Sequence, residues 1–319
     1  MYFIIFLGLL VAAAYLFGPR VQANTTVTFD PAIIGADPEA YLATAESKVD
    51  RIRDGLQKEI VWAFPASKAK TPIAIVYVHG FSASKNEVRP VPDNVAKALG
   101  ANLYLARLKG HGQDGAAMAT ASVNDWVNDF AESVAIGKMI GEKVIVVSTS
   151  TGGGLSTWAA NDPKLSKDIA GLAMISPNYG VQAAGSFLLT MPFGEQLANL
   201  IVGPEREFIP ENELHRKYWT PKYPTKSVLP MAALTALASK IRVEDIKIPA
   251  LFIYSETDKV VQPELTKAIA ARWGAPATIY ALPKNDDPYS HVIAGDALSP
   301  STTQDVTDKI LAWVKSSGF

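Results

Sequence analysis

Short apolar runs alternate with amphipathic stretches over most of the chain after residue 60. The runs at residues 73–78 and 144–147 are continuously apolar, which is typical of parallel strands covered by helices on both faces. Five further runs are rich in strand-forming residues: 60–64, 102–106, 171–175, 251–254 and 278–281. Helical patterns lie between them at 92–99, 123–140 (behind a Ser122 cap), 154–160, 263–273 and 303–315. This alternation predicts a mostly parallel, twisted sheet flanked by helices.

Two stretches depart from that rhythm. Residues 37–58 are rich in helix formers after an Asp-Pro start, which predicts a capped helix before the first strand. Residues 178–247 contain no clear strand, but they include two amphipathic pieces, 187–201 and 227–241, separated by Pro- and Gly-rich joints. We interpret residues 178–247 as a helical insertion between two strands of the sheet.

The first 17 residues carry no charged side chain. A membrane-spanning helix needs about 20 apolar residues, and a secretory signal normally begins with a basic region that is missing here. Val21-Gln22-Ala23 nevertheless offers small residues for a cut before Asn24. The expectation is a single-pass membrane anchor, with a periplasmic or secreted protein after cleavage near Asn24 as the alternative. In both cases residues 1–23 lie outside the fold.

Composition excludes several classes of protein. The chain has 30 basic and 31 acidic residues, a formal charge of −1, and no basic stripe that would indicate a nucleic-acid binder. A hydrophobic content of 48% with 19% charged residues excludes intrinsic disorder. The absence of cysteine excludes disulfides and thiolate nucleophiles or metal sites, and four histidines leave little for a histidine-rich site. The sequence therefore predicts neither a metal nor a cofactor.

The most informative motif is the serine-rich turn KVIVVSTSTGGG at residues 143–154. A predicted strand enters it and a predicted helix follows, which is the setting of a nucleophile elbow with Ser150 exposed on a tight turn. The usual pattern is G-x-S-x-G, and Ser148 stands at the first glycine as another small residue. An ordinary glycine-rich turn with a surface serine is the simpler alternative.

Two glycine-rich rivals point to nucleotide binding. Residues 152–154 lack the Lys-Ser/Thr that completes a phosphate loop. Residues 110–115 match G-x-G-x-x-G after a predicted strand. However, the acidic residue expected about 20 positions on, Glu132, falls inside a predicted helix rather than at a strand end. These observations argue against a dinucleotide site.

Four separated motifs together resemble the α/β-hydrolase superfamily, in its esterase and monoacylglycerol-lipase-like branch. VYVHGF at 76–81 is similar to the family's strand-end oxyanion loop, and RLKGHG at 107–112 to a loop of this branch. Residues 148–152 correspond to the elbow, and LFIYSETDKVV at 251–261 to the strand and turn that present the family's acid. The resemblance covers about residues 60–318. It implies a hydrolase core at 24–177 and 248–319, with a helical cap at 178–247.

The resemblance also implies a catalytic triad in the chain order Ser, Asp, His. That order gives Ser150, Asp258 and His291, the last being the only histidine after Asp258. Glu256 is the nearest rival for the acid. Asp286 and Asp287 lie too close to His291 in sequence to take the place of the strand-end acid.

The remaining site assignments concern backbone donors and the other histidines. The backbone N–H of Thr151 is the expected oxyanion donor after the nucleophile, and the resemblance makes the Phe81 N–H the second. His79 and His111 are interpreted as structural loop residues. His215, beside Arg216 and Lys217, is interpreted as a solvated side chain.

The insertion contains seven aromatic residues: Tyr179, Phe187, Phe193, Phe208, Tyr218, Trp219 and Tyr223. Ligand pockets are mostly apolar with few polar anchors, so an aromatic cap suggests an apolar acyl or alcohol pocket. We therefore expect a serine hydrolase of carboxylic esters with small or medium lipid-like substrates, associated with membranes through residues 1–17. A peptidase or amidase, a carbon–carbon-bond hydrolase, or a membrane-tethered binding protein without turnover remain alternatives.

Overall fold

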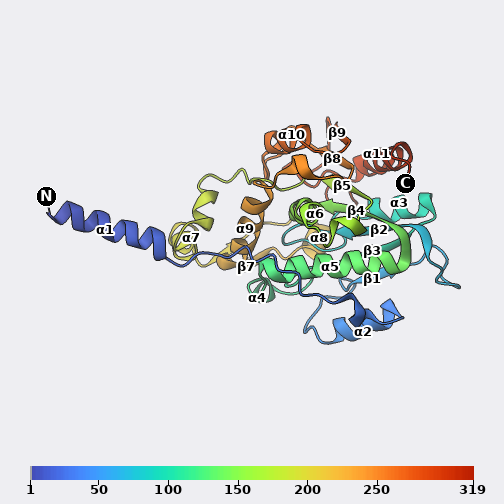
Figure 1. The fold of residues 1–319 in the computed structure, drawn as a ribbon, viewed down its shortest axis with the longest axis horizontal. Helices are drawn as coiled ribbons and strands as arrows, with labels where there is room; N and C mark the ends of the chain where they lie inside the picture. Colours follow the sequence, from blue (N-terminus) through green and yellow to red (C-terminus); the bar gives the residue numbers. More distant parts are fainter. Residues whose placement is uncertain (1) are drawn as a thin grey trace.

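The computed structural model describes residues 2–319, and its centre is a seven-stranded sheet in the order β1-β3-β2-β4-β5-β8-β9 (Figure 1). The edge strand β1 runs antiparallel to β3, and all other neighbours are parallel. The strands of this sheet are β1 (Glu59–Val61), β2 (Thr71–Val78), β3 (Asn102–Leu105), β4 (Gly141–Thr149), β5 (Gly171–Ile175), β8 (Ala250–Tyr254) and β9 (Ala277–Ala281). The predicted parallel sheet is confirmed, and β5 has the predicted bounds.

Helices cover both faces of the sheet, as continuously apolar strands require. Alternate strand residues divide between two cores: Val76 and Val146 pack on one side, and Tyr77 and Val147 on the other. The first core includes α5 (Val123–Ile140), α6 (Thr151–Asn161) and α10 (Pro263–Ala271); the second includes α3 (Val91–Leu99) and α11 (Thr303–Ser316). Ser122 caps α5 as predicted, within a capping box that Asp125 completes. The fold is that of an α/β-hydrolase.

Residues 178–247, which we call the cap, connect β5 to β8. The cap contains α7 (Gly194–Val202), α8 (Glu213–Tyr218), α9 (Val228–Ala238) and short 3₁₀ turns such as Ser186–Thr190. The prediction of one helix over 187–201 was wrong, because Pro192 lacks an N–H and Phe193 has a φ of +60°. The cap also contains a short strand pair where the sequence shows no clear strand: β6 (Glu205–Glu207) pairs with β7 (Lys222–Pro224). Three-residue strands in charged sequence give little period-two signal.

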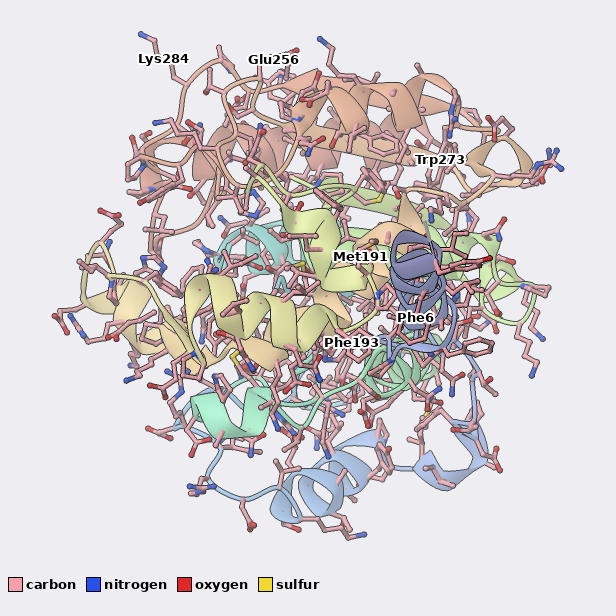
Figure 2. All side chains as sticks on the ribbon, turned by 90° about the vertical axis from the view of Figure 1, so that its left-hand side faces the viewer. Phe6, Met191, Phe193, Glu256, Trp273 and Lys284 are labelled. Atoms are coloured by element: carbon pink, nitrogen blue, oxygen red, sulfur yellow. The ribbon has the colours of Figure 1, made fainter. Side chains whose placement is uncertain are left out.

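The N-terminal segment forms the helix α1 (Tyr2–Phe17), which projects away from the body near α7 (Figure 1); Met1 lies outside the described residues. No helix within residues 2–319 has the length and apolarity of a membrane span, so the expected single-pass anchor is not supported. Figure 2 looks at the molecule from the side of α1, with Phe6 on α1 and Met191 and Phe193 of the cap labelled. The backbone N–H of Phe193 donates to the carbonyl of Pro19 at 2.8 Å.

The chain after α1 reaches the body as an extended segment. The Asn128 side chain on α5 accepts from the backbone N–H groups of Thr28 and Phe29 at 2.8 and 2.7 Å. The helix α2 (Pro38–Ser47) then begins at its predicted Asp37 cap but ends well before residue 58. The positive φ of Arg51 and Gly55 explains why the prediction to residue 58 was wrong, since a right-handed helix cannot continue through such residues.

Candidate active site

Ser150 lies on a strained turn between β4 and α6. Its φ of +51° and ψ of −114° place it in a region that residues other than glycine rarely adopt. The turn is possible because small residues surround it: a Cβ on Gly152 would meet the backbone carbonyls of Val78 and His79, and Ser148 is buried against Ser156 with an Oγ–Oγ distance of 2.9 Å. The turn has the geometry of a nucleophile elbow.

The structure brings His291 and Asp258 to this serine across long distances in sequence. The His291 Nε2 lies 3.0 Å from the Ser150 Oγ, and the His291 Nδ1 lies 2.8 Å from an Asp258 carboxylate oxygen. Because a carboxylate can only accept, Nδ1 holds the proton and the neutral Nε2 is left to accept the serine proton. All three residues are buried, at the carboxyl ends of β4, β8 and the chain after β9.

Asp258 and its rival Glu256 have opposite surroundings. The second oxygen of Asp258 accepts from the backbone N–H groups of Val260 and Val261 at 2.8 and 2.9 Å, which fixes the carboxylate toward His291. Glu256 instead points outward (Figure 2). There it pairs with Lys267 at 3.0 Å and accepts from the Tyr254 hydroxyl. The geometry therefore favours Asp258 as the partner of the imidazole.

Asp287 has a task that the sequence did not indicate. One of its carboxylate oxygens accepts from the backbone N–H groups of His291 and Val292 at 2.9 and 2.8 Å, and the other accepts from Tyr289 at 3.0 Å. These bonds close the turn that presents His291, in which Ser290 has a φ of +52°. The sequence signal for this role was an aspartate four residues before the histidine. Such an aspartate indicates an Asx-type turn, not an alternative acid for the triad.

Electrostatics at His291 combine two opposing effects. Burial lowers the pKa of the imidazole, but the Asp258 carboxylate, together with Glu87 and Asp287, outweighs burial and raises the pKa above its ordinary value overall. A base with a raised pKa takes up a proton more readily, as general-base catalysis requires.

The loop after β2 passes close to the serine, since a Cβ on Gly80 would lie 3.0 Å from the Ser150 Cβ. His79 Nε2 accepts from the Leu108 N–H at 3.2 Å, so its Nδ1 holds the proton and donates to the carbonyl of Gly80 at 2.8 Å. Burial and the neighbouring His111 keep the pKa of His79 well below its ordinary value, so this ring is neutral. Since the Gly80 carbonyl and the Phe81 N–H belong to one peptide plane and point in opposite directions, His79 fixes the direction of the Phe81 N–H.

The two predicted oxyanion donors are free to bind a ligand. Within residues 2–319, neither the backbone N–H of Phe81 nor that of Thr151 donates to an acceptor of the chain. The Thr151 N–H also stands in the first turn of α6, where the helix dipole favours negative charge.

The other two histidines belong to aromatic packing. His111 lies between His79, Phe81 and Trp126 with ring centroids 4.9 to 5.9 Å away, and burial lowers its pKa to about 4. His215 is 9% exposed and stacks on Phe208 at 5.2 Å. The expectation of a solvated His215 was therefore wrong: the positions beside it, Arg216 and Lys217, take the outer face of the short helix α8 while His215 takes the inner one.

An apolar cluster joins the cap to the serine. Phe81 packs edge-on against Tyr223 at 5.4 Å, and Asn178, whose N–H binds the Ser150 carbonyl at 3.0 Å, also contacts the Met231 sulfur at 3.5 Å. We call this group the acyl cluster; it consists of Phe81, Met118, Leu189, Phe208, Tyr223, Val228 and Met231. None of its members carries a charge.

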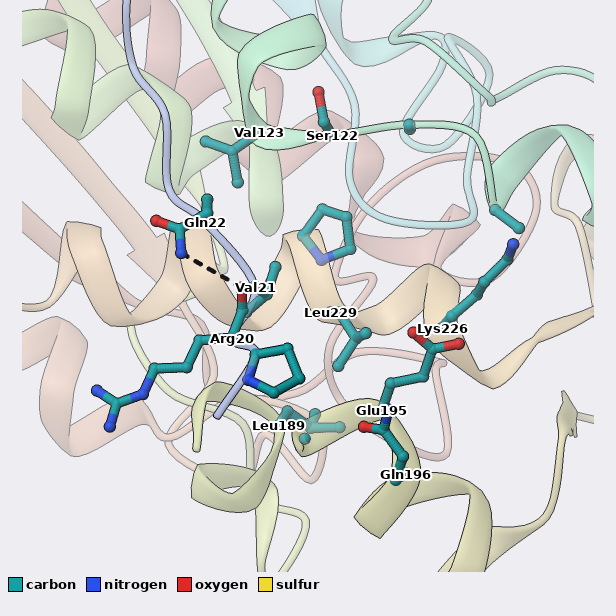
Figure 3. Close-up of a pocket in the computed structure, with 15 residues that line it drawn as sticks. Arg20, Val21, Gln22, Ser122, Val123, Leu189, Glu195, Gln196, Lys226 and Leu229 are labelled. Atoms are coloured by element: carbon teal, nitrogen blue, oxygen red, sulfur yellow. Dashed lines mark hydrogen bonds between the residues drawn. The ribbon is translucent and has the colours of Figure 1, made fainter. Parts of the chain in front are cut away.

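A pocket of about 380 Å³ lies between the cap and the N-terminal segment (Figure 3). Leu189, Leu229 and Pro230 from the cap line it, and residues 19–22 of the N-terminal segment form another wall. Leu189 belongs both to this pocket and to the acyl cluster, whereas the pocket contains none of Ser150, Asp258 and His291.

Comparisons with known proteins agree with the fold. The family described as serine aminopeptidase, S33, matches residues 69–283, which is more than half of the chain. The thermostable monoacylglycerol lipase of Bacillus sp. (strain H-257) is 30% identical over 194 residues, covering 60% of this chain and 73% of the relative. The chain belongs to this S33 family of α/β-hydrolases.

Solved structures show the same fold at low sequence identity. A chain from work on LipS and LipT, two metagenome-derived lipolytic enzymes, has a TM-score of 0.68 at 22% identity over 83% of this chain and 100% of its own length. The monoacylglycerol lipase of Paleococcus ferrophilus has a TM-score of 0.60 at 15% identity, covering 82% of this chain and 99% of its own. A soluble variant of the Saccharomyces cerevisiae monoglyceride lipase has a TM-score of 0.58 at 12% identity, covering 83% and 93%.

Proposed function

We propose that the protein hydrolyses carboxylic esters through an acyl-enzyme on Ser150, with His291 as the base and Asp258 as the acid that orients it. The observation that carries this proposal is the hydrogen-bonded chain from the Ser150 Oγ through His291 to Asp258, with distances of 3.0 and 2.8 Å, on a strained turn. A serine hydroxyl is a weak nucleophile until a base takes its proton, and this chain supplies that base in the required tautomer.

The steps follow from the positions of the protons. The Ser150 Oγ attacks the ester carbonyl carbon while its proton passes to the His291 Nε2, and Asp258 stabilises the imidazolium that forms. The negative charge that develops on the carbonyl oxygen is bound by the N–H groups of Phe81 and Thr151. His291 then protonates the leaving alcohol, and a water molecule deprotonated by the same imidazole hydrolyses the acyl-enzyme and restores Ser150.

The acyl cluster favours an ester of a fatty acid over a peptide. An aminopeptidase holds the charged amino group of its substrate, and a free carboxylate serves that purpose best. No member of the acyl cluster carries a charge, and the carboxylates of Asp258, Asp287 and Glu87 are already bound to His291, to backbone N–H groups or to the Tyr77 hydroxyl. Together with the similarity to a monoacylglycerol lipase, this supports a monoacylglycerol with a small or medium acyl chain as the substrate.

Labelling with a fluorophosphonate tests the mechanism, and a substrate panel tests the specificity. A fluorophosphonate should modify Ser150 in the wild type and should leave Ser150→Ala unlabelled. In a panel of p-nitrophenyl esters, monoacylglycerols and aminoacyl amides, we expect the highest kcat/KM for the monoacylglycerols. Fast turnover of aminoacyl amides would instead indicate a peptidase, and labelling without turnover of any member would indicate a binding protein.

We further propose that α1 associates with a lipid surface without crossing it. The helix is uncharged, and Leu9, Leu16 and Phe17 are mostly exposed; on the cap nearby, Phe187 and Leu200 are 66% and 83% exposed. Burying such apolar side chains at a membrane interface is favourable. Full-length protein should therefore fractionate with membranes, whereas a chain beginning at Asn24 should not and should keep its activity. An N-terminus mapped at Asn24 in the native protein would show a cleaved signal instead.

A further inference from the structure

Glu87 is a buried carboxylate that the mechanism above leaves without a task. It lies in the loop between β2 and α3 and is 2% exposed. One of its oxygens accepts from the Gly80 N–H at 2.7 Å and from the Tyr77 hydroxyl at 3.1 Å. A buried carboxylate without a role in folding or chemistry would be costly, so these contacts need an explanation.

Both contacts lead to the nucleophile. Gly80 is packed between Glu87 and Ser150: a Cβ placed on Gly80 would lie 2.8 Å from a Glu87 oxygen and 3.0 Å from the Ser150 Cβ. The Tyr77 hydroxyl is also 3.1 Å from the Oγ1 of Thr149, the residue before Ser150. Glu87 therefore supports the oxyanion loop on one side and the elbow on the other.

No lysine or arginine within residues 2–319 forms an ion pair with Glu87. The charged neighbours in its own loop are paired elsewhere: Lys85 with Glu59 at 2.5 Å, and Arg89 with Glu59 and Asp93. The titratable groups that face Glu87 are Tyr77 from β2 and His291 from the loop after β9, and beyond His291 lie Asp258 and Asp287. The only group near Glu87 that gains a positive charge during the reaction is thus the catalytic base proposed above.

The ionisation of Glu87 and that of His291 affect each other. Burial raises the pKa of Glu87 to about 7, against the opposing effects of the Gly80 N–H, His291 and the Tyr77 hydroxyl. The charge of Glu87 in turn is one of the causes that raise the pKa of His291. This reciprocal effect is expected when two ionisable groups share a site of low dielectric constant.

We propose that Glu87 is a positioning residue that holds the oxyanion loop through the Gly80 N–H and, as a carboxylate, strengthens His291 as a base. The peptide group before Gly80 is fixed by Glu87 and the one after it by His79, so the Phe81 N–H is constrained from both sides. The negative charge also stabilises the imidazolium that forms when Ser150 attacks. This inference rests on the proposed function and adds a second carboxylate to its machinery.

The pH dependence of Ser150 reactivity tests the inference. The rate of fluorophosphonate labelling and kcat/KM for a p-nitrophenyl ester should both fall at acid pH as His291 takes up a proton. We call this fall the acid limb of the pH profile. Glu87→Gln removes the negative charge but keeps a hydrogen-bond acceptor, so the acid limb should move to lower pH by roughly half a unit or more. The same variant should lower kcat by about 3- to 10-fold. Glu87→Ala should lower kcat about 10- to 100-fold at nearly unchanged KM, because the Gly80 N–H is left unbound.

Two further variants separate positioning from mere structural support. Glu132→Gln removes a buried carboxylate that pairs with Lys58, and its acid limb should coincide with that of the wild type. Glu87→Asp keeps the charge on a shorter side chain, so its acid limb should stay close to the wild-type limb while kcat falls. If a variant fails to fold, carboxyl NMR of the wild type decides: Glu87 should titrate in step with His291, and independent titration would overturn the inference.

The outcomes also distinguish this inference from the proposed function. An acid limb that does not move in folded Glu87→Gln overturns the role of Glu87 and leaves the triad untouched. A wild-type protein that is not labelled at Ser150 at any pH overturns the proposed function itself.

Discussion

Two regions of the molecule bury charged side chains, and they treat them differently. Beside α2 and α5, each buried carboxylate meets a cation: Arg107 binds Glu46 with two hydrogen bonds of 2.9 and 2.7 Å, and Lys58 pairs with Glu132. We call this group the ion-pair network.

Around Ser150 the carboxylates meet backbone N–H groups instead. Asp258, Asp287 and Glu87 are all held in this way, and among the described residues the side chain beside them that gains a positive charge in the proposed reaction is His291. Burial disfavours both charges of the Arg107–Glu46 pair, but the pKa of Glu46 is lowered overall and that of Arg107 is raised, so this pair stays charged over a wide pH range. Carboxylates that are held by neutral N–H groups carry a negative charge that no cation balances. That charge can stabilise His291 when the imidazole becomes positively charged in the proposed reaction. Burial of charge alone therefore does not mark a functional site, whereas an incomplete balance of buried charge does.

The largest expected effect comes from removing the members of the proposed triad. In Ser150→Ala and in His291→Ala, kcat for ester hydrolysis should fall on the order of 10⁴-fold or more, and the double variant should be hardly worse because the residues act as one unit. Asp258→Asn should cost somewhat less, since the serine and the imidazole remain in contact.

Steady-state kinetics on variants that unfold at the wild-type urea midpoint would check this. Glu256→Gln serves as the control, because that carboxylate points outward. Near-normal turnover in folded Ser150→Ala would contradict the assignment of Ser150 as the nucleophile. If Glu256→Gln lowered kcat and Asp258→Asn did not, Glu256 would be the acid of the triad.

The ion-pair network should show the opposite behaviour. Lys58→Met leaves Glu132 and Asp129 without their cation, and breaking a buried pair from one side costs about 3–5 kcal/mol of unfolding free energy. The turnover of the protein that remains folded should not change. Urea unfolding and active-site titration with a fluorophosphonate measure the two quantities separately. The double variant Lys58→Met, Glu132→Gln should regain part of the lost unfolding free energy. A large fall in kcat, counted per fluorophosphonate-labelled site, would show that the ion-pair network and the site around Ser150 are coupled.

The stability of the folded protein should depend on pH through Glu87. The folded state raises the pKa of Glu87 from 4.5 to about 7, so the folded protein binds this proton more tightly than the unfolded chain does. The contribution of Glu87 to stability is therefore complete below about pH 4.5 and is lost as pH rises through about 7. Relative to the wild type, Glu87→Gln should gain about 3 kcal/mol between pH 4.5 and pH 8.

Urea unfolding of both proteins at several pH values measures that difference. Glu256→Gln is again the matched control. In the wild type the hydrogen bond from Lys267 lowers the pKa of Glu256, so Glu256 titrates below the range from pH 4.5 to pH 8. A difference between Glu87→Gln and the wild type that does not change with pH would show that Glu87 is ionised to the same extent in the folded and unfolded states.

The smallest expected effect concerns the cap. Leu189 borders both the acyl cluster and the pocket of Figure 3, so Leu189→Ala should shift the preferred acyl-chain length of p-nitrophenyl esters with changes of a few-fold in kcat/KM. Labelling of Ser150 by a small fluorophosphonate should stay nearly normal. Leu200→Ala, on the exposed side of α7, is the control. Equal preferences in all three proteins would indicate that this part of the cap only covers the site.

The sequence was sufficient to predict the parallel sheet and the turn that carries Ser150, because both leave local signals in the chain. Apolar runs with strand formers predict β2 and β4, and the turn after β4 contains the small residues that an elbow needs. The family order then selects His291 although it lies 141 positions from Ser150.

Features that depend on tertiary contacts could not be predicted in the same way. Nothing in the residues around Glu87 indicates that its side chain turns back to Gly80, and no spacing rule connects it to His291. His215 looked solvated because its neighbours in sequence are basic, whereas the packing of Phe208 against it decides its environment. In the cap, a single residue with a positive φ, Phe193, divides a helix that the apolar pattern extends through it.

The attachment of the N-terminal segment has a mechanical consequence. The hydrogen bond from Phe193 to Pro19 joins the cap to the chain only two residues after α1 ends, and the bonds of Asn128 to Thr28 and Phe29 follow further along. A force applied along α1 is therefore borne first by the cap and only afterwards by α5. Load on α1 therefore reaches the cap before it reaches the sheet that holds Ser150 in place.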